Sequence, residues 1–392
     1  MKKYNVVIAG GAMAGMTLAL ALDELSGGAL DIAVVEAYKA DHSQHPGFDS
    51  RSIALSYGTV QLLQSYQLWS HIREHATAIR HIHVSDSHHF GMTEIVADDL
   101  SVDALGYVVE LSHVGQVFAQ QVQKRQRIDL FCPDKVKSIC REAEKVDIEL
   151  SSGDILSAQL LVAADGAHSH SCQMAGLTAQ QHDFSQTAII ANVRSDLSHH
   201  GRAFERFTEF GPIALLPLSE NRLSLVWCMP PEVAEHVAGC EDAEFLSRLQ
   251  QGFGWRLGRF NQVGSRASYP LSLSYRPQTV SHRIAAVGNA AQTLHPIAGQ
   301  GFNLGIRDVA SLADEILMSL DDPGRYQTLA NFRARRADDS RHTIALTTSL
   351  VRLFSNDIPL LSGARNVGLA AMDNFPALKS PLLNIALGLV AR

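Results

Sequence analysis

The first 36 residues contain a glycine turn between two short apolar runs, and this pattern restricts the fold more than any other in the chain. Val6–Ala9 predicts a strand buried on both faces, and the turn Gly10–Gly15 leads into a helix expected over 16–25. A second buried strand is expected over 32–35 and ends in Glu36. This order is typical of a dinucleotide-binding unit, in which the helix N-terminus holds the pyrophosphate and the carboxylate binds the ribose.

The turn and the carboxylate also limit which nucleotide can bind. Ala12 stands at the middle glycine position of the usual turn, so its methyl group tightens the approach of the backbone to phosphate. Glu36 disfavours a 2′-phosphate because two negative groups would meet, and the site therefore favours the adenosine end of FAD or NAD. The alternative is a tight strand-to-helix turn without a ligand.

Two later strands are also expected to end in glycine turns. Residues 160–164 precede Asp165-Gly166, and residues 283–287 precede Gly288-Asn289. Because ligands of open α/β sheets bind outside the carboxyl ends of the strands, both turns are expected at the same edge as the first one. Each also has a plainer interpretation, since Asp-Gly commonly forms an ordinary turn and a glycine-rich loop can simply precede a helix.

Small residues and one arginine extend this candidate site. Gly299 and Gly301 flank the start of a helix expected over about 303–320, where bare backbone would let a flat ring lie close to the main chain. Arg51 comes shortly before a helix expected over 57–72. It is either a surface cation or a group that reaches a phosphate or a ring edge.

From about residue 183 to 285 the sequence predicts mainly strands. The alternation around Arg202, Phe204 and Arg206 favours an antiparallel sheet with one solvated face, which would cover the nucleotide site. The glycines of 252–258 follow no buried strand, so this segment is expected to be a loop instead of a second nucleotide site. The expected strands are 187–193, 203–207, 213–217, 223–228 and 269–273.

Composition excludes several classes of function. A formal net charge of −7 argues against nucleic acid as a partner. The five cysteines never occur as CxxC and are expected to be reduced thiols, and the paired histidines lack metal-ligand spacing, so we expect no metal. No apolar run reaches the ~18 residues of a membrane span. We therefore expect a cytoplasmic protein, with peripheral contact at the inner face of the membrane as the alternative.

Together these motifs resemble the single-component flavin-dependent aromatic hydroxylases related to p-hydroxybenzoate hydroxylase. The likeness rests on GGAMAG, Glu36, the Arg51 segment, VAADG and the segment 288–308. Four further segments resemble the ubiquinone-biosynthesis branch of that family: 201–208, 211–218, 224–228 and 295–298. The family usually has Gly-Asp at the third turn, where this chain has Gly288-Asn289. An amide can still bond a ribityl hydroxyl, although without a charge.

The resemblance implies tightly but non-covalently bound FAD, reduction by NADPH or NADH, and hydroxylation of a prenylated phenol with O2 through a flavin hydroperoxide. The chain would position the phenol and exclude water. No side chain stands out as the base for the phenol, and His295 is a weak candidate that packing explains more simply. The residues implied to contact FAD are Gly10, Gly11, Ala12, Ala14, Gly15, Glu36, Arg51, Asp165, Gly288, Asn289, Pro296, Gly299, Gln300, Gly301 and Asn303.

The expected fold is α/β, with a Rossmann-like FAD-binding domain built on a parallel sheet, an inserted antiparallel β-sheet substrate domain and a C-terminal helical segment. We expect a discontinuous FAD-binding domain of residues 1–75, 104–180 and 283–340. Residues 76–103 and 181–282 would form the substrate domain, and 341–392 the C-terminal region. Helices are expected there over 343–354, 360–372 and 381–390.

Several alternatives remain open on sequence alone. The apolar C-terminal region suits core packing with a homo-oligomer face, a membrane surface, a prenyl chain, or a partner in a multi-enzyme ubiquinone-biosynthesis assembly. On the same fold, a prenyl-chain reductase would consume NADPH without oxygen, and a catalytically silent flavin-binding scaffold would consume neither.

Overall fold

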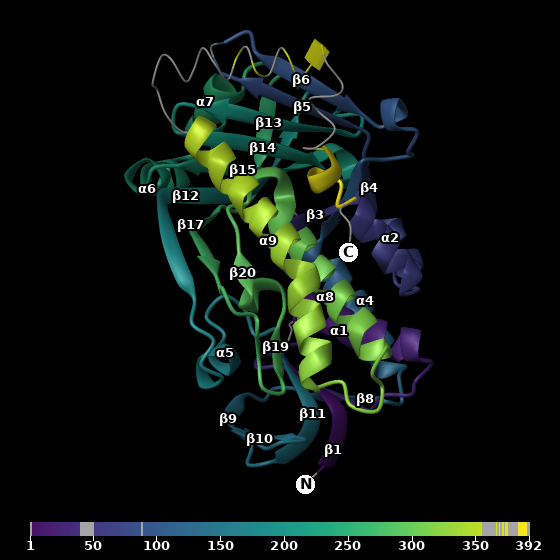
Figure 1. The fold of residues 1–392 in the computed structure, drawn as a ribbon. Helices are drawn as coiled ribbons and strands as arrows, with labels where there is room; N and C mark the ends of the chain where they lie inside the picture. The colour runs from purple at the N-terminus through teal and green to yellow at the C-terminus, as the bar shows by residue number, and fades with distance from the viewer. Residues whose placement is uncertain are drawn as a thin grey trace.

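The computed structural model describes residues 2–39, 51–87 and 89–354, with residues 366, 368, 371, 373–374 and 383–389 near the C-terminus. A largely parallel sheet and a largely antiparallel sheet form the two main parts of the molecule (Figure 1). The long helix α9 (Tyr326–Phe354) runs diagonally across both parts. This architecture confirms the expected α/β class with an antiparallel second sheet.

The parallel sheet is built around β1 (Lys2–Ala9), whose second half is completely buried. β1 pairs in parallel with β2 (Ile32–Val35) on one side and with β11 (Ile155–Ala163) on the other, and β11 pairs in parallel with β19 (Ile284–Ala286). Helices α1 (Met13–Ser26) and α8 (Gln300–Leu317) contribute to one apolar core on this sheet. The remaining strands of the sheet are β8 (Ile128–Phe131), β9 (Val136–Arg141), β10 (Val146–Leu150) and β18 (Val280–Ser281).

The antiparallel sheet contains four long central strands that run next to one another. They are β12 (Gln180–Ser195), β15 (Arg222–Met229), β14 (Gly211–Pro217) and β13 (Arg202–Thr208). β13 also pairs in parallel with β5 (His81–Asp86), which brings an early segment of the chain into this sheet. The outer strands are β6 (Met92–Val96), β16 (Phe260–Val263), β17 (Ala267–Tyr275) and β20 (Gln292–Thr293).

A small sheet and short helices connect the two main parts. In the small sheet, β7 (Gly106–Glu110) lies between β3 (Ser52–Ser56) and β4 (Ala76–Ile79). The remaining helices are α2 (Tyr57–Ser65), α3 (Trp69–Ile72), α4 (Leu111–Gln123), α5 (His170–Met174), α6 (Pro231–Gly239) and α7 (Asp242–Phe253). Within the part of the chain described, no helix is long and apolar enough to cross a membrane.

The structure corrects the expectation of a solvated sheet face. Phe204 packs against Phe253 of α7, and Arg206 on the same face donates from Nε to the Gly252 carbonyl at 3.0 Å. The sequence predicts no helix between residues 228 and 269, where the structure has α6 and α7. They bury the face that carries Phe204, and the opposite face borders a cavity.

One helix prediction also needs correction. The helix expected over 57–72 is interrupted at Gln67, whose φ of 56° is left-handed, so α2 and α3 are separate. The expected boundary between residues 340 and 341 falls inside the continuous helix α9. The helix expected over 343–354 is the end of α9, and residues 383–386, within the helix expected over 381–390, are helical. The helix expected over 360–372 lies largely outside the described residues.

Candidate functional site

Three glycine turns lie at one edge of the parallel sheet because the strands before them are neighbours. β1, β11 and β19 run in the same direction, and Gly10, Asp165 and Gly288 follow their carboxyl ends. All three residues line one cavity of about 1620 Å³. The chain thus brings turns from its beginning, middle and end to a single site.

The first turn is shaped for close backbone contact. Gly10 has a φ of 106°, and a Cβ there would overlap the carbonyl of Ala164. A Cβ at Gly15 would overlap the carbonyl of Gly10. Helix α1 begins after Ala12, which has no side-chain acceptor to cap it, so the N–H groups of the first helical turn remain available to an anion.

Glu36 is held in place at the end of β2. Its Oε2 accepts a hydrogen bond from the Gly11 N–H at 2.6 Å, and its Oε1 accepts one from the Tyr38 N–H at 2.9 Å. The carboxylate therefore spans from the second strand to the glycine turn, beside the helix N-terminus. This is the position in which a ribose hydroxyl would meet a carboxylate.

The second turn is also fixed by hydrogen bonds. Asp165 accepts from the Ser169 hydroxyl and, at 3.0 Å, from the Ser171 N–H, so its carboxylate organises the start of α5. Arg51 directly precedes β3 and is exposed. Both residues line the cavity, as the sequence predicts for cofactor-binding groups, although Asp165 already has protein partners.

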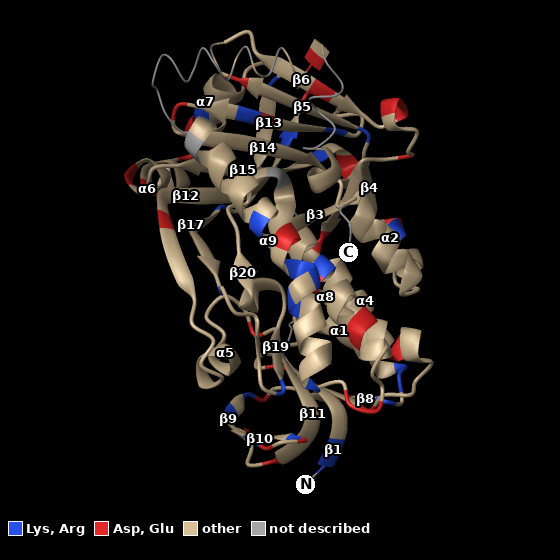
Figure 2. Ribbon diagram, in the orientation of Figure 1, with Lys and Arg blue, Asp and Glu red and all other residues tan. Residues whose placement is uncertain are grey.

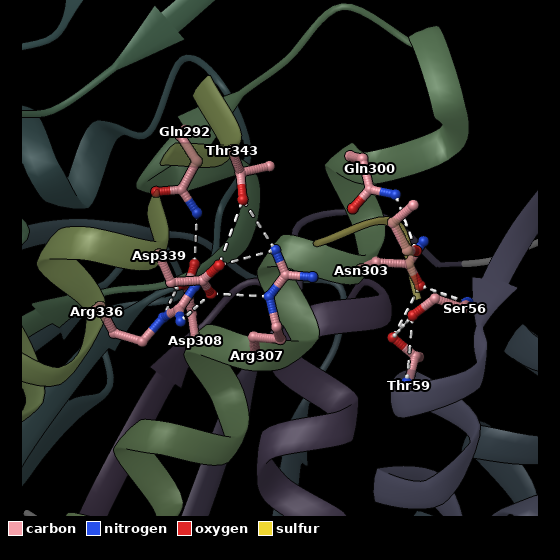
Figure 3. Close-up of polar contacts among 11 residues, drawn as sticks. Ser56, Thr59, Gln292, Gln300, Asn303, Arg307, Asp308, Arg336, Asp339 and Thr343 are labelled. Atoms are coloured by element: carbon pink, nitrogen blue, oxygen red, sulfur yellow. Dashed lines mark hydrogen bonds and ion pairs between the residues drawn. The ribbon is translucent and has the colours of Figure 1, made fainter. Parts of the chain in front are cut away.

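A buried charge network holds the third turn. The Gly288 N–H and the Gln292 amide donate to Asp308 Oδ2 at 3.1 and 2.6 Å, and Arg336 Nε donates to Asp308 Oδ1 at 2.8 Å. Arg336 also bonds Asp339, which accepts from Arg307 Nε at 2.8 Å (Figure 3). Blue and red segments accordingly gather where α8 and α9 lie together (Figure 2). The network joins the turn to both helices.

The positive charges in this network lower the pKa of Asp339. Burial alone would raise the pKa of Asp339, but the guanidinium groups of Arg336 and Arg307 hold it below its ordinary value. All four charged side chains of the two pairs are at least 96% buried, so each carboxylate balances a guanidinium away from water. The third turn is therefore positioned by ionised groups that do not line the cavity.

The loop before α8 brings backbone to the cavity wall. Gly299 is left-handed, with a φ of 61°, and its Cβ would lie 3.3 Å from Cβ of Ala54. Asn303 donates to the carbonyls of Ala54 and Gly299 and accepts from the Ser56 N–H and the Thr59 hydroxyl (Figure 3). Asn303 lines the cavity, but its side-chain amide forms these four hydrogen bonds and so connects the loop to β3 and α2.

His295 lies behind this loop and is not among the described residues that line the cavity. It is 1% exposed, and its Nδ1 accepts from the Ile297 N–H at 3.2 Å. Nε2 therefore carries the proton and donates to Gln186 Oε1 at 3.2 Å. Burial lowers the pKa of His295 to about 4, so the ring is neutral and orients the loop instead of reaching a ligand.

The structure brings the predicted residues together around one space. Gly11 and Gly15 lie behind the wall, where they permit the turn, and the others border the cavity directly. These are Gly10, Ala12, Ala14, Glu36, Arg51, Asp165, Gly288, Asn289, Pro296, Gly299, Gln300, Gly301 and Asn303.

Two features of the site were not predicted from the sequence. One is the carboxylate–guanidinium network of Asp308 and Arg336, whose partners are 28 residues apart and follow no local pattern. The other is Glu205, a carboxyl group on the sheet face that borders the cavity. The strand alternation around Ala203, Glu205 and Phe207 carried a signal for it, because one charge interrupts apolar residues on the same face.

The shape and chemistry of the cavity fit FAD. Drug-sized ligands occupy about 300–1,000 Å³, so a cavity of about 1620 Å³ has room for a dinucleotide and a second ligand. One end has the open helix N-terminus and Glu36, which suit pyrophosphate and ribose. The other end has the bare backbone around Gly299 and an apolar sheet, which suit a flat ring.

Comparison with known proteins agrees with this fit. Residues 3–347 match the FAD binding domain family. The chain is 33% identical to the ubiquinone hydroxylase UbiL of Rhodospirillum rubrum, over 99% of this chain and 90% of that protein. It is 30% identical to the 3-demethoxyubiquinol 3-hydroxylase of Escherichia coli, over 98% of both chains.

A solved structure supports the fold. The p-nitrophenol 4-monooxygenase PnpA of Pseudomonas putida superimposes with a TM-score of 0.80 over 99% of both chains, at 20% identity. At that identity the likeness extends to the fold, whereas the family rests on the sequence matches. The chain belongs to the FAD-dependent monooxygenases, in the group that contains the ubiquinone hydroxylases.

Proposed function

We propose that this protein hydroxylates the ring of a polyprenylated phenol in ubiquinone biosynthesis, with bound FAD, NAD(P)H as the reductant and O2 as the source of the oxygen atom. The substrate to test first is 2-octaprenyl-6-methoxyphenol, because the sequence resembles the hydroxylase of that compound over essentially the whole chain. The ubiquinone hydroxylases among its relatives support the same substrate class.

One observation carries the proposal: a single cavity runs from the nucleotide-binding turns to an apolar sheet face. Its wall includes Gly10 and Glu36 at one end and Ile82, Leu216 and Val226 at the other. A phenol on the sheet side would therefore share one space with the cofactor ring. Proximity of this kind is what an oxygen transfer between cofactor and substrate requires.

One part of the cavity wall is apolar and suits an isoprenoid tail. Ile79, Leu105, Leu383 and Leu387 belong to one apolar cluster and all line the wall. Each buried methylene contributes about 0.8 kcal/mol, so a tail of several isoprene units gains much of its affinity along such a wall. We propose that the tail lies here and that the phenol points toward the loop at Gly299.

FAD, when bound, supplies the transfer of electrons from the reduced nicotinamide to dioxygen, and the remaining tasks fall to the chain. The first helical turn and Glu36 would hold the ADP part, Arg51, Asp165 and Asn289 the central part, and the backbone of 296–301 the ring. The apolar sheet face excludes water from the phenol and so limits loss of oxidant as hydrogen peroxide.

The test is an oxygen-labelling experiment with purified protein. Incubation with NAD(P)H, 18O2 and 2-octaprenyl-6-methoxyphenol, or a shorter-chain analogue, is expected to give a product one labelled oxygen atom heavier by mass spectrometry. Reductant consumption that continues under nitrogen with a reduced prenyl chain would identify a reductase instead. FAD binding without any consumption of reductant would identify a silent scaffold.

Prenylphenols that accumulate in cells without the protein identify the step. The compound that accumulates is expected to be the one that the purified protein hydroxylates. Because polyprenylated phenols partition into membranes, we propose that the enzyme acts at the inner face of the membrane. Accumulation of a compound that the purified protein leaves unchanged would count against the proposed substrate.

A further inference from the structure

The sheet face that borders the cavity has a carboxyl group in the middle of an apolar row. Glu205 on β13 pairs with Val84 on one side and with Ala214 on the other. The row continues across the neighbouring strands, and each of its members lines the cavity. In order across the sheet it consists of Thr93, Val84, Glu205, Ala214, Val226 and Ile190.

Packing on either side of Glu205 fixes where its side chain points. Phe204 lies on the opposite face, in the core formed with α7, so Ala203, Glu205 and Phe207 share the face that borders the cavity. Phe207 packs against Ile297 of the loop before α8. The carboxyl group is therefore next to the part of the sheet that contacts the loop proposed to hold the flavin ring.

Within the described ranges, no cation pairs with the Glu205 carboxyl group on this face. Its Oε1 is fully buried and, among the residues that the structure describes, has no hydrogen-bond partner. The side chain keeps some accessible surface because it borders the cavity. Burial raises the pKa of Glu205 to about 8, and burial is the one cause of the shift.

The titratable groups described on the surrounding elements do not pair with Glu205. On the same face, Asp86 of β5 accepts from the Asn366 amide at 3.1 Å, and burial raises the pKa of Cys228 of β15. Arg206 lies on the opposite face, where it bonds Gly252 and Ser85. Helix α9 contributes uncharged side chains to the cavity wall, namely Leu346, Thr347, Leu350 and Leu353.

An isolated carboxyl group in such a wall does not stabilise the sheet. Transfer of a polar group into an apolar environment costs free energy unless a hydrogen bond replaces those of water. The neighbours of Glu205 in its row are Val84 and Ala214, and an apolar side chain would fit between them without that cost. Oε2 is not among the fully buried atoms, and Glu205 lines the cavity, so a ligand there can bond this second oxygen of the carboxyl group.

We propose that Glu205 accepts the proton of the phenolic hydroxyl of the substrate, an inference that rests on the proposed function. The phenol O–H bond breaks, a carboxyl O–H bond forms, and the electron pair stays on the phenolate oxygen. The phenolate raises the electron density at the ring carbons ortho and para to it, where the new oxygen atom is received. The oxygen atom and electrons come from O2 and NAD(P)H, as in the proposed reaction, and the carboxylate is restored when its proton leaves to water.

The test compares kcat/KM for product formation between pH 5.5 and 9.5 in the holoenzyme and three variants, with a short-chain prenylated 6-methoxyphenol. Glu205→Gln removes the proton acceptor and keeps the shape. Glu209→Gln makes the same chemical change in the exposed turn after β13 and is the matched control. Glu205→Asp keeps the carboxyl group but withdraws it by one methylene.

In the wild type, kcat/KM is expected to rise with pH and level off above about 8, because it reports the ionisation of the free enzyme. Glu205→Gln is expected to lose this inflection and to form product roughly 100-fold more slowly or worse, the usual effect of losing a general base. It should also form less product per NAD(P)H consumed. Glu209→Gln is expected to keep the wild-type profile.

Other outcomes separate the two proposals. If the wild type hydroxylates no prenylphenol, the proposed function fails. If the wild type is active and Glu205→Gln retains both rate and inflection, the role of Glu205 is refuted and the function stands. If Glu205→Gln does not fold or retain FAD, Glu205→Asp decides: a lower product yield with a retained inflection supports the proposal, and an unchanged rate and yield refute it.

Discussion

Replacing Asp339 by Asn removes one of the two carboxylates that balance two buried guanidinium groups. Asp339 accepts from Arg307 and Arg336, and the side chains of the Arg307–Asp339 pair are 2% and 3% exposed. The adjacent residue of the same helix provides the matched control. Asp338 pairs with Arg341 at 3.1 Å, but those two side chains are 78% and 71% exposed.

The expected magnitudes follow from burial. Breaking a buried ion pair by removing one partner costs about 3–5 kcal/mol, because a charge remains without compensation, whereas an exposed pair contributes about 0.2–1 kcal/mol. Unfolding entropy of about 2.1 cal/mol/K per residue gives about 0.8 kcal/mol/K for a chain of this length. Asp339→Asn is therefore expected to lower Tm by about 4–6 °C, and Asp338→Asn by about 1 °C or less.

The assay is thermal unfolding of both variants and the wild type, saturated with FAD at neutral pH. Because the pKa of Asp339 is lowered in the folded state, its contribution is complete above the unfolded-state value of about 3.9 and is lost as the pH falls below it. The difference between the two variants should therefore shrink below about pH 4. Equal Tm values for the two variants at neutral pH would refute the view that this network supports the third turn.

Three further changes test the site and its ionisation. Gly299→Val places a β-branched side chain at a left-handed φ of 61° and should lower the FAD-to-protein ratio measured by absorbance, whereas Gly239→Ala, with open space around it, should not. Glu36→Gln should raise the Kd for FAD roughly 10- to 100-fold in a fluorescence titration, the equivalent of one charge-assisted hydrogen bond. The pKa of Glu205 is higher in the folded state, so its protonated form favours folding and the wild-type protein loses stability as the pH rises from about 4.3 to about 8. Glu205→Gln cannot ionise, so its Tm should increase relative to that of the wild type across this range.

The nucleotide site was predictable because its signals are local. A buried strand followed by glycine can be recognised within ten residues, and parallel strands place such turns at a common edge. The sequence therefore predicted Gly10, Asp165 and Gly288 as neighbours, and the structure shows that all three line the cavity. Pattern alone did not predict that Asn303 fastens the loop, since its partners Ser56 and Thr59 lie more than 240 residues earlier.

The antiparallel sheet was less predictable because its faces depend on what covers them. Phe204 and Arg206 suggested a solvated face, but α7 covers it, and no periodicity within β13 reveals a helix that begins at Asp242. The alternation of Ala203, Glu205 and Phe207 places Glu205 on one face of the strand, but it does not identify the neighbours of Glu205 on adjacent strands. The pairing of β13 with β5 and β14 is what places it among apolar residues.

The order in which the turns occur along the chain has a consequence for biosynthesis. Gly10 leaves the ribosome early, but its neighbour in the sheet, β11, ends at Ala163, and Gly288 is held only after Asp308 and Arg336 have been added. A nascent chain therefore cannot enclose the cofactor until it has been translated as far as Arg336, in a chain of 392 residues. Flavin capture is therefore a late event in biosynthesis, and the apolar cavity walls are exposed until then.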